Sequence, residues 1–182
     1  MYFLRRIWYT LFPKPKTVND PEFGILTLDW MHSIEVPPKP PRGLWIGKTD
    51  FAPLGRSVTV AFVMESELGS TPFQRKLYHS VEDHWNVFRD ELAQQLLQLI
   101  HEWYGEAART EKPSTEEFFQ NWVRLNGVDI RDSATREPQS ADAVLDFSVL
   151  PDALTNPSLL KFQDHNPVAH LDDGKVVGVA MI

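Results

Sequence analysis

A length of 182 residues and a mass of 20.9 kDa fit one domain with a hydrophobic core of its own. A hydrophobic content of 42% and a charged content of 24% exclude a wholly disordered chain. The net charge of −7 disfavours general nucleic-acid binding, because the phosphate backbone is also negative, and it suits a basic protein partner. The absence of cysteine excludes disulfides, thiolate zinc sites and cysteine nucleophiles, and it is compatible with the cytoplasmic location that we expect.

The first twelve residues are aromatic and basic, with Arg5 and Arg6 interrupting the apolar run. A membrane-spanning helix needs about 20 apolar residues, so this segment is too short to span. We expect a short helix that packs on the body or on a partner, and the alternative is peripheral contact with a membrane. Residues 14–21 are polar and contain prolines, which is typical of a connector. The predicted organisation is one α+β domain over residues 1–182, in which residues 1–19 are leader and connector.

Three strands are predicted in the first half of the chain, at residues 23–28, 44–48 and 57–64. The third has the clearest pattern, with Val58, Val60 and Phe62 on one face. Between the first two strands, residues 36–41 contain four prolines, which favours a loop of polyproline character.

One long amphipathic helix is predicted from Pro72 to about residue 104. Its start is marked by Ser70-Thr71-Pro72 and its end by Gly105. Apolar residues recur at steps of three and four along one face: Val81, Trp85, Phe88, Leu92, Leu96, Ile100 and Trp103. A second, shorter helix is predicted at residues 114–122, where Ser114 and Glu117 have capping-box spacing.

The C-terminal segment is predicted to close the sheet. A strand is expected at residues 143–149, and residues 170–182 read as a hairpin with Asp173-Gly174 at its turn. The fold class expected is therefore α+β, a mainly antiparallel sheet with one long helix packed across a face.

The motifs of common enzymes are incomplete in this chain. His101-Glu102 opens a zinc-protease pattern, but position 105 is Gly where the second His is needed. His79 and His84 would lie about 140° apart around a helix, which disfavours a shared metal ion. Asp164, His165 and His170 lie close in sequence to the turn aspartates, but no serine elbow accompanies them. We therefore expect no catalytic, cofactor or metal residues, and no enzyme.

A family resemblance rests on the opening and closing segments. The run Asp20-Pro21-Glu22-Phe23-Gly24-Ile25-Leu26 and the pair Asp164-His165 before the final hairpin resemble a group of small bacterial cytosolic α+β proteins. This chain has Asn166-Pro167 where a Gly usually follows the His. Several proteins of that group look like immunity or antitoxin components, so the resemblance implies that role here.

The leading hypothesis is a non-enzymatic immunity or antitoxin protein that binds a basic partner, a cognate toxin, directly. The residues predicted to bind the partner are Trp30, Trp45, Asp164 and His165. One alternative is a hydrolase or metal-dependent enzyme that uses Asp164 and His165. Another is a peripheral membrane or adaptor protein that uses Arg5, Arg6, Trp8 and the proline run.

Overall fold

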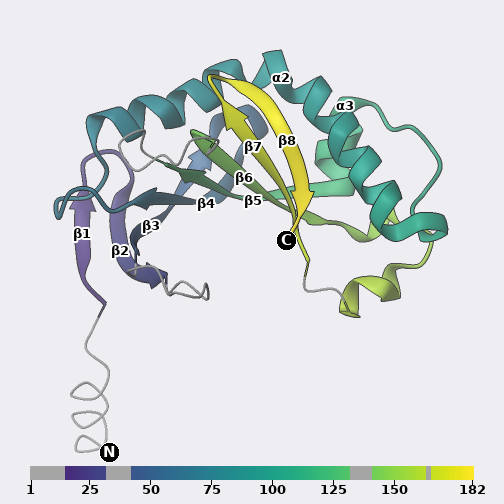
Figure 1. Cartoon of the computed structure of the whole chain (residues 1–182), viewed down its shortest axis with the longest axis horizontal. Coiled ribbons are helices and arrows are strands. Elements are labelled where there is room, and N and C mark those ends of the chain that lie inside the picture. Colours follow the sequence, from purple (N-terminus) through teal and green to yellow (C-terminus); the bar gives the residue numbers. More distant parts are fainter. Residues whose placement is uncertain (1–14, 32–41, 132–140, 163–164) are drawn as a thin grey trace, which may run out of the picture.

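The computed structural model describes residues 15–31, 42–131, 141–162 and 165–182, and it has the predicted α+β architecture. Figure 1 shows one curved sheet with a long helix, α2, lying across it. The elements in chain order are β1 (Thr17–Asp20), β2 (Gly24–Met31), β3 (Arg42–Phe51), β4 (Arg56–Val63), α2 (Pro72–Tyr104), α3 (Thr115–Glu117), β5 (Val123–Ile130), β6 (Ala143–Val149), β7 (Pro167–Asp172) and β8 (Lys175–Met181).

The eight strands of this sheet are ordered as they occur in the chain. Every neighbouring pair is antiparallel except β4 and β5, which run parallel. A parallel pair needs a crossover connection, and α2 lies within the segment that joins β4 to β5. The fold is therefore two antiparallel meanders, β1–β4 and β5–β8, joined through the helix.

The ends of α2 are set by local sequence, as predicted. The Thr71 side chain accepts a hydrogen bond from the Gln74 N–H, and the Gln74 side-chain oxygen accepts one from the Thr71 N–H. At the other end Gly105 has a φ of 54°, a conformation that side-chain-bearing residues rarely adopt. The predicted helix over residues 72–104 is confirmed.

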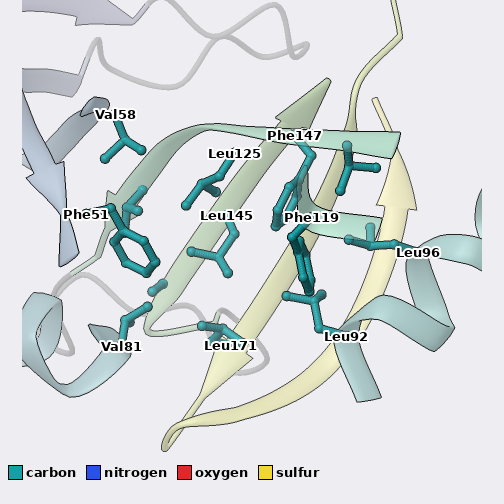
Figure 2. Packing of buried hydrophobic residues seen from close by; sticks show 14 of the residues in the cluster. Phe51, Val58, Val81, Leu92, Leu96, Phe119, Leu125, Leu145, Phe147 and Leu171 are labelled. Carbon is teal, nitrogen blue, oxygen red and sulfur yellow. The ribbon is translucent and has the colours of Figure 1, made fainter. Parts of the chain in front are cut away.

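The inner face of α2 forms the centre of the core. The predicted stripe is buried from Val81 to Ile100, and only its last member, Trp103, is 45% exposed. Figure 2 shows Val81, Leu92 and Leu96 of α2 among side chains of the sheet. Those labelled in the figure include Phe51, Val58, Leu125, Leu145, Phe147 and Leu171. One continuous cluster runs from β2 to β8.

The C-terminal hairpin packs along α2. Asp173 and Gly174 have φ values of 49° and 70°, and they form the predicted turn between β7 and β8. A Cβ placed on Gly174 would lie 3.6 Å from Cγ of His84 on the helix. At the other end of the hairpin, the His165 ring lies against Trp103. The two ends of the hairpin therefore lie against α2, at His84 and at Trp103.

Three local predictions were wrong or incomplete. Residues 17–20, expected to be a connector, form the edge strand β1, which pairs with β2. The helix expected at residues 114–122 is one turn, α3, followed by a π-helical turn at Phe118–Trp122. The strand β5 was not anticipated, because its alternation is interrupted between Leu125 and Gly127, where its pairing with β6 is also irregular.

The leader at residues 1–12 and the proline run at residues 36–41 lie outside the described residues. Across the part of the chain that the structure describes, no helix has both the length and the apolar character that a membrane span requires.

Candidate partner-binding surface

The four residues predicted to bind a partner have different positions. Trp45 is fully buried, and its Nε1 donates a hydrogen bond to the Ser66 carbonyl at 2.7 Å. It is therefore a core residue and is not available to a partner. Trp30 belongs to β2, but its side chain lies outside the described part of the structure, as does Asp164. His165 is exposed.

His165 belongs to a small aromatic surface at the end of α2. Its ring meets the Trp103 ring edge-on, with centroids 5.2 Å apart and an interplanar angle of 69°. Next to it, Asn166 and Ile182 exchange two backbone hydrogen bonds, which place the 64% exposed Ile182 beside this pair. Trp is among the residue types that are enriched in the hot spots of protein–protein interfaces. The sequence placed Trp103 in the core stripe, so its exposure was not predicted.

A groove of about 750 Å³ lies between the outer face of α2 and the connection that follows it. Its apolar lining comes from Ala93, Leu97 and Phe118, and carboxylates stand at two places along the helix, Asp90 and Glu102. The facing wall includes Lys112, Pro113 and Thr115. We call this feature the α2 groove.

The connection beside the groove is anchored to α2 and to the rest of the domain. The His101 Nε2–H donates to the Arg109 carbonyl at 2.7 Å. The Arg109 N–H donates to the Ala153 carbonyl at 3.0 Å, and Ala108 forms a β-bridge with Leu154. The wall of the groove is therefore held from both sides, which favours a preformed site.

Acidic side chains are concentrated around the groove. Residues 82–117 contain nine acidic and three basic residues, so this segment carries −6 of the chain's net charge of −7. Four of the acidic residues are exposed and fall within roughly 120° of the helix circumference: Asp83, Asp90, Glu91 and Glu102. Their spacing is visible in the sequence, but the helix was predicted from the apolar stripe on its other side, and the acidic face was not singled out.

A second polar cluster, at the start of α2, has a structural role. Asp20 is buried and accepts hydrogen bonds from the N–H groups of Glu22, Phe23 and Ser70 and from the Ser70 hydroxyl. Burial opposes ionisation of Asp20, but these hydrogen bonds outweigh it and lower the pKa of the carboxyl below its ordinary 3.8. The interaction joins the β1–β2 turn to the segment that leads into the helix.

His79 extends this cluster. Its two ring nitrogens face the carboxylates of Glu22 and Glu82. Burial lowers the pKa of His79, but the two carboxylates outweigh it, so the net shift is upward from 6.5. Glu82 also accepts a hydrogen bond from the Ala52 N–H at 3.0 Å, so the cluster connects three segments of the domain.

A third cluster lies on the face of the sheet away from α2. Asp129 on β5 and Asp146 on β6 share this face, in ladder pairs that are separated by the pair Val128–Leu145. Each has one buried oxygen, Oδ1, without a hydrogen-bond partner, and burial raises the pKa of both carboxyls. Arg131 lies 3.7 Å from Asp129 and counters part of the shift there. Among the described residues, no three His, Asp or Glu side chains are grouped so that they could hold a metal ion.

No family model, curated protein or solved structure matches this chain. The immunity-like role drawn from the opening and closing segments therefore stays a prediction. The functional argument rests on the surface itself, which is acidic and grooved, and on the exposure of Trp103 near the same end of α2.

Proposed function

We propose that this chain is a non-enzymatic binding protein that neutralises a basic protein partner, a cognate toxin, by covering the partner's positive surface. The α2 groove forms the main contact surface, and the exposed Trp103–His165 pair, at the same end of the helix but on its other side, adds an aromatic contact. The partner's class follows from charge, and the toxin role follows from the family resemblance.

The observation that carries the proposal is the placement of the chain's negative charge. Of its net charge of −7, −6 belongs to residues 82–117, the segment that includes the outer face of α2 and the connection after it. A one-sided field of this kind steers an oppositely charged protein and accelerates association. Charge alone gives little affinity once water and salt screen it, so a tight complex also needs apolar anchors.

Trp103 and the apolar floor of the groove supply such anchors. Trp103 is 45% exposed although it lies on a helix whose other large residues are mostly buried. It follows Glu102 in the chain but points about 100° further around α2, away from the groove, so a partner that contacts both must cover the C-terminal end of the helix. This arrangement is typical of interfaces in which charged rims surround a few buried aromatic contacts.

The hydrolase alternative is less well supported. It depends on Asp164 and His165, and the ring that contacts His165 among the described residues is that of Trp103. The peripheral membrane or adaptor alternative depends on residues outside the described part of the chain. Neither gains an observation as specific as the charge distribution on α2.

The experiment is co-expression with the product of the adjacent gene, scored as relief of toxicity and as recovery of a complex. Replacing four carboxylates on the outer face of α2 by their amides should abolish protection: Asp83, Asp90, Glu91 and Glu102. The matched control removes two Asp and two Glu charges elsewhere on the surface: Asp50, Asp152, Glu65 and Glu67. Equal loss of protection in both variants would contradict the assignment of the surface, and a harmless neighbour would contradict the toxin role.

A further inference from the structure

The α2 groove has a lining that favours one kind of occupant. We propose that it receives an extended segment of the partner that carries a basic residue at each end and an apolar residue between them. This inference rests on the proposed function, since it names the part of a basic partner that the groove takes.

The distance between the two carboxylates sets the length of the segment. Asp90 and Glu102 are twelve residues apart on α2, which corresponds to about 18 Å along the helix axis. An extended chain covers at most about 3.3–3.6 Å per residue, so about five or six residue steps span this distance. Two basic residues with that separation would each meet a carboxylate.

The polar lining of the groove favours an extended occupant over a helical one. An extended segment leaves its backbone N–H and C=O groups free to pair with the amides of Gln94 and Gln98, whereas a helix uses these groups for its own hydrogen bonds.

The middle of the groove provides contacts for such a chain. Leu97 and Phe118 offer an apolar floor for one side chain. Gln94 and Gln98 lie between the two carboxylates, and their amides have donors and acceptors that suit the backbone of an extended segment. Gln98 is already oriented, because its Nε2 donates to Glu102 at 2.7 Å.

Lys112 gives the inference a distinguishing test. It lies on the wall that faces α2, where its positive charge opposes a basic occupant. Removing that charge should strengthen binding, an outcome that a purely structural role of Lys112 would not produce.

The test uses labelled, end-capped peptides in a serine background, with two arginines and one central leucine. The arginines are separated by two, five or nine residue steps, and glutamine replaces arginine in the neutral controls. Binding to the full-length protein is followed by fluorescence anisotropy at low salt and by shifts of amide resonances at Leu97, Gln98 and Phe118. The peptide with five steps should bind several-fold more tightly than the other two and should shift these resonances.

Single variants locate the contact. Glu102→Gln should weaken binding of the five-step peptide at least threefold, and Lys112→Gln should strengthen it by a similar factor. The matched control, Glu106→Gln, removes the same charge from an exposed position outside the groove and should have a smaller effect.

Binding that ignores arginine spacing, or equal effects of Glu102→Gln and Glu106→Gln, would overturn the inference. Tighter binding of a helical peptide with arginines twelve steps apart would also overturn it. The complex with the whole partner could still form in those cases, so a failure here is separable from a failure of the proposed function.

Discussion

Asp20→Asn tests how the first meander is attached to α2. The Asp20 side chain is fully buried, and its two oxygens receive four hydrogen bonds that join the β1–β2 turn to Ser70. Asn has nearly the same shape, so the core is left filled and the substitution isolates the polar interactions. We expect a large loss of stability from a change of one atom.

The magnitude follows from which hydrogen bonds survive. The amide oxygen of Asn still accepts from Glu22 and Phe23, whereas its NH₂ group faces the Ser70 N–H, which donated to Asp20 at 2.9 Å. A buried N–H left without an acceptor costs about 1–3 kcal/mol, and the remaining hydrogen bonds lose about 1 kcal/mol in going from a charged to a neutral acceptor. The expected decrease in the free energy of unfolding is roughly 2–4 kcal/mol.

The assay is urea unfolding at several pH values, with the exposed Asp90→Asn as the matched control, which should change stability by less than about 0.5 kcal/mol. The pKa of Asp20 is lowered in the folded state, so its contribution is present above the ordinary value of 3.8 and is lost as pH falls through the folded-state pKa. The difference between the native protein and Asp20→Asn should therefore shrink in acid. A loss below 1 kcal/mol at pH 7, or one that is the same at pH 7 and pH 3, would refute this reasoning.

Three further changes test other parts of the structure. Leu92→Ala removes a fully buried side chain and should lower the free energy of unfolding in urea by about 2–5 kcal/mol. Val87→Ala, at a 76% exposed position of the same helix, should lower it by less than about 0.5 kcal/mol. Similar losses in the two variants would mean that the buried face of α2 has been wrongly assigned. His79→Gln should flatten the pH dependence of stability above pH 6.5. The pKa of His79 is raised in the folded state, so its contribution to stability is present below pH 6.5 and is lost as pH rises through the folded-state pKa. An unchanged pH profile would contradict this. Asp129→Asn should raise the melting temperature at pH 7, because burial raises the pKa of Asp129 and its ionised form weakens the fold. The gain in melting temperature should diminish towards pH 4. A lower melting temperature at pH 7 would refute this reasoning.

The long helix and the final hairpin were predictable because their signals are local. The α2 stripe repeats at steps of three and four, and Thr71, Pro72 and Gly105 mark the ends. The turn at Asp173-Gly174 uses residues that tolerate positive φ. These elements could be placed without knowing what packs against them.

The errors arose where tertiary contacts decide the structure. Thr17–Asp20 forms a short hairpin with β2, and the bond from Asp20 to Ser70, fifty residues away, fixes this hairpin to the start of α2. The π-helical turn at Phe118–Trp122 buries Phe118, Phe119 and Trp122 and leads directly into β5, so tertiary packing overrides the helical pattern. Neither contact leaves a signal in a short window of sequence.

The candidate surface was predicted only in its charge. A net charge of −7 favours a basic partner, but composition does not tell where the charge lies. Of the proposed contact residues, Trp45 is in the core, because its side chain shares the helix-facing side of the sheet with its buried neighbours. Trp103 was assigned to the core stripe and is half-exposed, since the stripe ends where α2 passes the edge of the hairpin.

The most direct test of the central claim is the rate at which this protein associates with the product of the adjacent gene, measured by stopped flow between 50 and 500 mM salt. We predict that association slows by about tenfold or more over this range, because salt screens the acidic face of α2, and that dissociation changes much less. Trp103→Ala should act in the opposite way, accelerating dissociation with little effect on association. An association rate that does not respond to salt, or a partner that binds equally well after the four α2 carboxylates are removed, would contradict the account.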